Sequence, residues 1–122
     1  MPLAFTLDEH LTGPLWSAIQ RHNHSGGPFI DAVRVGDPPD LPGGSKDPDI
    51  LRWCEREGRL LLTFDRNTMP RHLADHLQAG HHSPGVVILL EGYGLPDLIN
   101  ALELTAYAGF PDDYRDQIRY LP

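Results

Sequence analysis

The sequence predicts an α/β fold in which helices cover both faces of a mostly parallel sheet of four to five strands, a three-layer α-β-α sandwich. Short continuous apolar runs that suit buried strands alternate along the chain with helical patterns. The resulting order, β-α-β-α-β-α-β-α, is typical of parallel sheets with helical crossovers. The length of 122 residues fits one domain, which we expect to span 1–122.

The first half of the chain is expected to form two strands and one helix. Residues 3–7 form an apolar run that predicts the first strand. A helix should begin at Pro14, because proline suits the first helical position. A second strand is expected over 29–35, which is rich in β-branched and aromatic residues. The proline- and glycine-rich segment 36–45 predicts an exposed loop.

The second half begins with a strong helix signal. Asp47 precedes Pro48, which predicts an N-cap followed by proline in the first turn. This helix should end near Glu57, with Gly58 as its C-terminal cap. The remaining elements expected are a strand over 60–64, a helix over 70–78, a strand over 85–90, a helix over 96–108 and an edge strand over 118–121.

Charge and composition narrow the classes of function. The net charge of −7 argues against a protein that coats nucleic acid through bulk electrostatics, although it is compatible with a nuclease that binds metal cations. Half of the ten basic residues fall in one stretch, which favours either phosphate binding by arginine or a solvated helix face with ordinary ion pairs. These residues are Arg52, Arg56, Arg59, Arg66 and Arg71.

The same composition indicates where the protein is expected to reside. No run approaches the roughly 18 apolar residues needed to cross a membrane. The N-terminus lacks the basic region of a signal peptide. Cys54 is the single cysteine, so an internal disulfide is excluded. We therefore expect a cytoplasmic protein.

Three aspartates carry the predicted chemistry. Asp8 follows the first strand and Asp65 follows the strand over 60–64. Because parallel strands present their carboxyl ends at one edge, where ligands bind, both should lie there. Asp47, at a helix start, can reach the same edge. Convergent carboxylates need a cation, and oxygen ligands favour Mg²⁺ or Mn²⁺. The plainer alternative for Asp8 and Asp47 is turn formation and helix capping.

Three short motifs resemble those of a known family. They are Leu7-Asp8-Glu9-His10-Leu11, Ser45-Lys46-Asp47-Pro48-Asp49-Ile50-Leu51 and Leu61-Leu62-Thr63-Phe64-Asp65-Arg66-Asn67. In this order and spacing they resemble the PIN-like proteins, relatives of the PilT N-terminal domain and of the VapC toxin ribonucleases. The resemblance is greatest to a compact branch with an Asp-Glu-Asn-Leu motif, a Ser-Asp-x-x-Ile-Leu helix start and a strand ending in Leu-Leu-Thr-x-Asp-x-Asp.

The resemblance implies a metal-dependent ribonuclease, the toxin of a toxin–antitoxin pair. Asp8, Asp47 and Asp65 would then be the catalytic residues and the ligands of Mg²⁺ or Mn²⁺, with Arg66 and Arg71 contacting the RNA phosphates. The implied partners are an RNA substrate and an antitoxin protein, and a homodimer is left open.

The sequence departs from the family pattern at two positions. Asn67 replaces an aspartate and His10 replaces an asparagine. The loss of a carboxylate at position 67 lowers the charge of the site, which favours an alternative function as a non-catalytic module that binds RNA or a protein partner. Asp49 and Glu91 are candidate substitutes for the missing carboxylate, and both also fit as ordinary surface charges.

Other residues suggest further alternatives. The acidic pair after the first strand is similar to a receiver-like phosphorylation pocket, but no lysine follows the strand over 85–90. His72 and His76 have the i, i+4 spacing of zinc ligands on a helix, although surface histidines near a loop are the simpler interpretation. Trp16 and Trp53 fall at helical core positions and are expected to serve packing.

Overall fold

The computed structural model describes residues 2–11 and 13–122, and these form a five-stranded sheet flanked by helices. All strand pairs are parallel, so the predicted α/β class is confirmed and the sheet is wholly rather than mostly parallel. The strands are β1 (Phe5–Leu7), β2 (Ala32–Arg34), β3 (Leu60–Thr63), β4 (Val86–Leu89) and β5 (Ile118–Leu121). The helices are η1 (Glu9–Leu11), α1 (Pro14–His24), α2 (Asp47–Glu57), α3 (Met69–Gln78), α4 (Leu95–Ala108) and α5 (Pro111–Tyr114).

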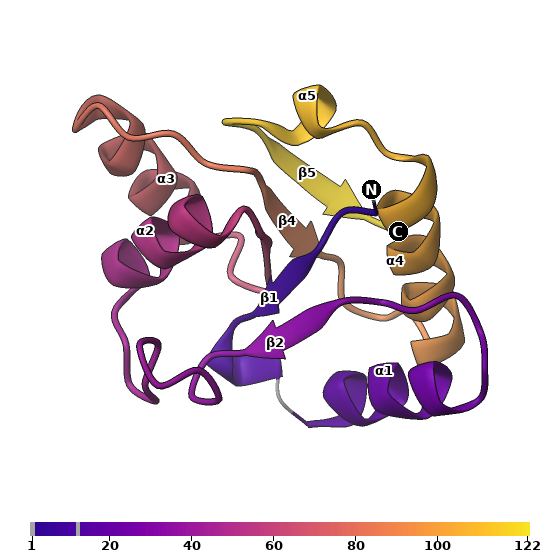
Figure 1. Ribbon diagram of the computed structural model, residues 1–122. Helices are drawn as coiled ribbons and strands as arrows, with labels where there is room; N and C mark the ends of the chain where they lie inside the picture. Colours follow the sequence, from indigo (N-terminus) through magenta and orange to yellow (C-terminus); the bar gives the residue numbers. More distant parts are fainter. Residues whose placement is uncertain (1, 12) are drawn as a thin grey trace.

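Helices cover both faces of the sheet, as Figure 1 shows with α1 and α4 on one side and α2 and α3 on the other. Alternate residues of the central strands point to opposite faces and therefore feed two separate cores. Leu60 and Leu62 of β3 pack with α1 and α4, whereas Leu61 packs with α2 and α3. This double burial explains why the strands read as continuous apolar runs in the sequence.

The strand order β2-β1-β3-β4-β5 reverses direction between β1 and β3. After β1 the chain moves outward to β2, and it then returns past β1 to form β3. In doubly wound sheets such a reversal leaves a crevice outside the carboxyl ends of the two strands, which is where ligands bind. Leu7 pairs with Leu62, so β1 and β3 end almost level with each other.

Two local predictions need correction. Asp47 is the first residue of α2 rather than its N-cap, because Lys46 is the extended residue before the helix, and among the described residues no side-chain hydrogen bond caps this end. The Asp47 carboxylate is therefore not used in capping. The short helix α5 is not predicted from the sequence either, and α1 ends at His24. Gly58 ends α2 in the left-handed conformation, as predicted.

The described helices are shorter than a membrane span requires. The longest, α4, has 14 residues, and a span needs about 20 apolar residues. Among the described residues, no helix is long and apolar enough to cross a membrane.

Candidate carboxylate site

Asp8 lies immediately after β1 at the reversal of strand order. Its backbone N–H donates to the Leu62 carbonyl at 3.0 Å, which extends the pairing of β1 with β3 by one step. Its side chain is only 7% exposed. Oδ1 accepts the Glu9 backbone N–H at 2.7 Å, and Oδ2 accepts the Thr63 hydroxyl at 2.9 Å. These two donors balance part of the cost of burying the carboxylate.

Thr63 connects Asp8 to Asp65. It is the last residue of β3 and is buried. Its hydroxyl donates to Asp8 and at the same time accepts the Asp65 backbone N–H at 3.0 Å. The sequence predictions give Thr63 no role, although a hydroxyl at the end of the Leu60–Leu62 run is a signal that identifies it.

Asp65 lies two residues beyond β3 and binds the turn that leads into α3. Its Oδ1 accepts the backbone N–H groups of Asn67 at 3.1 Å and of Thr68 at 2.9 Å, and its Oδ2 accepts the Thr68 hydroxyl. The Thr68 hydroxyl and backbone N–H bonds hold the pKa of Asp65 below its usual value. Asp65 therefore has a structural role that the sequence analysis did not anticipate.

Asp47 approaches the same edge from the first turn of α2. Its pKa is raised, chiefly by burial and then by the negative charge of Asp8, with a further contribution from Asp65. Two histidines oppose this shift: His10, and His72 of α3, whose Nε2 lies 3.3 Å from Asp47 Oδ2. The Thr63 hydroxyl links Asp8 to Asp65, and the charges of both aspartates act on Asp47. We call Asp8, Asp47 and Asp65 the carboxylate site.

Glu9 fixes the loop that leads into α2. Both oxygens of its carboxylate lie 3.2 Å from the Gly44 backbone nitrogen, 35 residues away in the chain. Gly43 passes so close that an added Cβ would lie 3.2 Å from Glu9 Oε1. This contact ties the loop, and with it the start of α2, to the end of β1. Glu9 thus helps to position Asp47.

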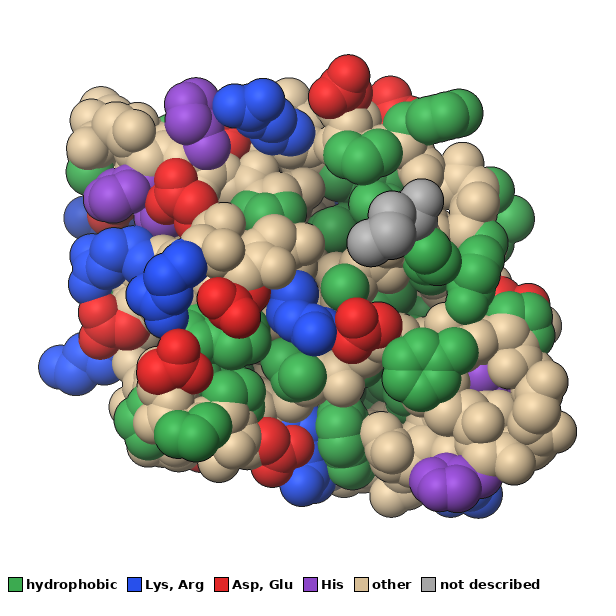
Figure 2. Space-filling model, in the orientation of Figure 1, with side chains coloured by type: hydrophobic (Ala, Val, Ile, Leu, Met, Phe, Trp, Pro, Cys, Tyr) green, Lys and Arg blue, Asp and Glu red, His purple; other side chains and the backbone are tan. Residues whose placement is uncertain are grey.

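The remaining predicted residues lie around this site to different degrees. Arg66 and Asn67 are exposed in the turn after β3, and Arg71 is exposed on α3. Asp49 forms an ion pair with Arg52 on the surface of α2. Figure 2 shows basic side chains interleaved with acidic ones over α2, so this face carries mixed charge. Glu91 is exposed after β4.

The oxygens of the carboxylate site have capacity for a cation. A carboxylate accepts about four hydrogen bonds; Asp8 accepts two, from Glu9 and Thr63, and Asp65 accepts three. The pKa of Asp47 is raised by burial first and then by the negative charges of Asp8 and Asp65, which a cation would neutralise. The donor set, made only of carboxylate oxygens, suits Mg²⁺ or Mn²⁺.

A tighter group of potential ligands lies elsewhere. Among the residues that the structure describes, the three whose ligand atoms all lie within 4.8 Å of one another are Glu55, His76 and His81, not the three aspartates. His72 and His76, which have the spacing of zinc ligands in the sequence, contact different carboxylates. His72 contacts Asp47, and His76 contacts Glu55. Comparisons of this chain with models of protein families, with curated proteins and with solved structures give no match.

Proposed function

We propose that this chain is a PIN-like, metal-dependent ribonuclease that hydrolyses RNA phosphodiesters at the carboxylate site. One observation carries the proposal: Asp8 and Asp65 are joined through the Thr63 hydroxyl where the strand order reverses between β1 and β3, and burial together with their charges raises the pKa of Asp47 at the start of α2. Aspartates collected where the strand order reverses are well placed to bind a ligand.

The proposed roles follow from the contacts of each residue. Asp8 is held rigidly by Glu9 and Thr63, so it offers a fixed oxygen for a cation. Asp47, which makes no capping contact, supplies a second, and Asp65 a third. A bound Mg²⁺ or Mn²⁺ would neutralise phosphate charge and lower the pKa of water. His72 orients Asp47 through their 3.3 Å contact.

The substrate class rests on the motif resemblance together with nearby positive charge. Arg66 is exposed next to Asp65, and Arg71 is exposed on α3 one residue before His72. Guanidinium groups bind phosphate in a bidentate manner. RNA is therefore the proposed substrate, and an antitoxin protein that covers this edge of the sheet is the proposed partner.

The test is cleavage of single-stranded RNA with Mg²⁺ or Mn²⁺, with and without a chelator. We expect cleavage that the chelator stops, and loss of at least about a hundredfold in rate for Asp8→Asn and Asp47→Asn, since each amide keeps the shape and removes the charge. Asp49→Asn is the matched control, because Asp49 lies in the same helical turn as Asp47 but pairs with Arg52. Equal activity in all three variants would refute the proposed site.

A second candidate function, a non-catalytic module that binds RNA or a protein, is favoured by one observation. Three hydrogen bonds from Asn67 and Thr68 already occupy Asp65, and position 67 provides an amide where a further carboxylate would strengthen metal binding. Asn67→Asp separates the two candidates. If the natural protein cleaves RNA, the variant should cleave it about tenfold faster. This increase corresponds to an activation free energy that is lower by about 1.4 kcal/mol. Cleavage by the variant alone would support the binding module.

A further inference from the structure

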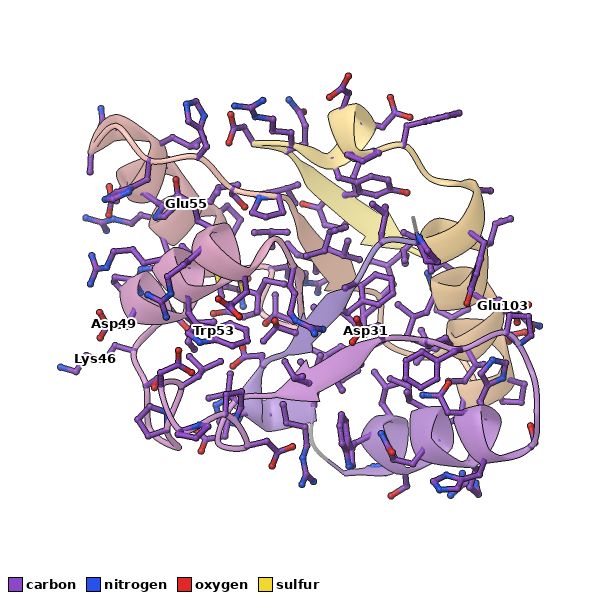
Figure 3. The ribbon with its side chains drawn as sticks, viewed as in Figure 1. Asp31, Lys46, Asp49, Trp53, Glu55 and Glu103 are labelled. Carbon is purple, nitrogen blue, oxygen red and sulfur yellow. The ribbon has the colours of Figure 1, made fainter. Side chains whose placement is uncertain are left out.

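The C-terminal ends of α2 and α3 bring together one carboxylate and two imidazoles, remote from the carboxylate site. Glu55 Oε1 lies 3.4 Å from His76 Nε2 and 3.1 Å from His81 Nδ1. The two imidazole rings stack with their centroids 4.8 Å apart. Figure 3 shows Glu55 on α2, on the side next to α3. We call Glu55, His76 and His81 the Glu-His-His cluster.

The orientation of Glu55 is set by the backbone. Its Oε2 accepts the His82 backbone N–H at 2.9 Å, which directs Oε1 toward the two imidazoles. This hydrogen bond is also the main reason that the pKa of Glu55 lies below its usual value. His82 is fixed in turn, because its Nδ1 lies 2.9 Å from Asp116 Oδ2. The carboxylate is thus anionic and held in place by contacts outside the cluster, as are many metal ligands.

His76 contributes the buried member of the cluster. Its side chain is 3% exposed, and its Nε2 lies 2.8 Å from the His82 carbonyl oxygen as well as 3.4 Å from Glu55 Oε1. A proton on Nε2 therefore faces two oxygens. A cation that replaces this proton would lie next to the same two oxygens. The His81 imidazole, which lies 3.1 Å from Glu55 Oε1, is close to the same position.

The spacing of the ligand atoms fits a tetrahedral transition-metal ion. Ligands about 2.0–2.1 Å from zinc in a tetrahedron lie about 3.3 Å from each other. The separations from Glu55 Oε1 to the two imidazole nitrogens, 3.4 and 3.1 Å, are close to that value, and all three ligand atoms lie within 4.8 Å of one another. The planes of the two stacked rings differ by 20°, so the rings cannot both direct a nitrogen lone pair at one ion. The His81 side chain must therefore rotate when the ion binds. Its side chain is 40% exposed, which leaves room for that rotation.

We propose that Glu55, His76 and His81 form a binding site for Zn²⁺ or a similar transition-metal ion. The mixed nitrogen and oxygen donors favour this class of ion over Mg²⁺, which prefers oxygen ligands. Eight residues of helix separate Glu55 from Asp47, or about 12 Å along the axis of α2, so the two sites are distinct. Glu55 also lines a cavity of about 360 Å³ together with His82.

The test is titration of the full chain with Zn²⁺ in competition with a chromophoric chelator. We expect one Zn²⁺ per chain with a dissociation constant of about 1 μM or lower. His81→Ala and Glu55→Gln should each weaken binding at least about tenfold. His81→Ala is the safer variant because the His81 side chain is partly exposed, and circular dichroism tests whether the variant folds. Binding should also weaken at acid pH, since imidazole binds metal only when neutral.

Two control variants distinguish this site from other zinc ligands. His24→Ala removes an exposed histidine at the end of α1, and Asp47→Asn removes charge from the carboxylate site. Both should bind Zn²⁺ as the natural protein does, whether or not RNA is cleaved. Three outcomes would each overturn the proposal. They are an unchanged affinity in His81→Ala and Glu55→Gln, a loss of affinity in Asp47→Asn, and a dissociation constant above about 1 mM for the natural protein.

Discussion

Thr63 and Thr6 show how much the surroundings of a single buried hydroxyl matter. Both side chains are buried on adjacent central strands. The Thr63 hydroxyl donates to Asp8 and accepts from the backbone of Asp65, whereas the Thr6 hydroxyl has no hydrogen-bond partner among the described residues. The same residue type is therefore part of the site in one strand and only packs in the other.

We predict that Thr63→Val lowers the free energy of unfolding by about 1–3 kcal/mol, because it leaves an oxygen of Asp8 and the N–H of Asp65 without a partner. It should also reduce RNA cleavage, because Asp8 loses a contact that orients it. Urea denaturation and the cleavage assay measure the two effects. Thr6→Val is the matched control and should be neutral or stabilising; a similar loss in both variants would contradict the prediction.

The raised pKa of Asp47 predicts an unusual pH dependence. Its value in the fold lies above the unfolded value of 3.8, so the ionised carboxylate destabilises the fold at neutral pH. This penalty is lost as the pH falls through the folded pKa toward 3.8. Asp47→Asn should therefore increase the free energy of unfolding at pH 7.5, within the roughly 0.5–2 kcal/mol typical of stabilising substitutions.

The gain from Asp47→Asn should shrink as the pH approaches 4, where the natural carboxyl becomes protonated. Denaturant unfolding at several pH values measures it, and Asp49→Asn serves as the control because Asp49 is paired with Arg52 on the surface. A destabilised Asp47→Asn at pH 7.5 would show that the Asp47 charge is favourable in the fold.

At the scale of elements, α3 connects the two proposed sites. It begins after the turn bound by Asp65, contacts Asp47 through His72, and contacts Glu55 four residues later through His76. The helix packs beside α2 on one face of the sheet (Figure 1). The turn at Asp65 therefore affects the positions of both histidines.

We predict that Asp65→Ala lowers the free energy of unfolding by about 0.5–2 kcal/mol, the range found for residues that cap helix ends. Asp65→Asn should cost less, because the amide oxygen can still accept the N–H groups of Asn67 and Thr68. The lowered pKa of Asp65 means that its contribution is present above pH 3.8 and is lost as the pH falls through the folded pKa.

Both variants of Asp65 should abolish RNA cleavage if the residue binds metal. Thermal denaturation and the cleavage assay, run on the same preparations, separate the two roles. An active Asp65→Asn would assign Asp65 to the turn alone and leave Asp8 and Asp47 as the proposed ligands.

At the scale of the whole molecule, the reversal of strand order decides where the site lies. The reversal between β1 and β3 places Asp8 and Asp65 at the ends of adjacent strands, and the loop held by Glu9 brings the start of α2 to the same edge. A cation bound there would join three segments of the chain. About 40 residues separate Asp8 from Asp47, and about 20 separate Asp47 from Asp65. Such a link is expected to stabilise the fold as a unit.

We predict that millimolar Mg²⁺ or Mn²⁺ raises the melting temperature by several degrees. A ligand at 100 times its dissociation constant adds about 2.7 kcal/mol to the free energy of unfolding, and about 1 kcal/mol corresponds to a few degrees for a domain of this size. Differential scanning calorimetry measures the change. Asp47→Asn should lose the increment and Asp49→Asn should keep it; no increment in the natural protein would count against the metal.

The sequence by itself determined the fold class and the positions of most elements. The apolar runs that form β3 and β4 are buried on both faces of the sheet. A continuous run of apolar residues is therefore enough to predict each of these strands from its own sequence. The placement of Asp8 and Asp65 at one edge also followed from the sequence, because each comes directly after a strand and parallel strands share their carboxyl edge.

Only the tertiary structure decided which side chains meet across elements. Glu55 and His76 lie 21 residues apart, and the sequence paired His76 with His72 because helical spacing is the only distance that it encodes directly. The packing of α2 beside α3 instead gave each histidine its own carboxylate partner. The role of Asp65 in the turn before α3 was hidden for the same reason: hydrogen-bond partners depend on backbone directions that residue types alone do not specify.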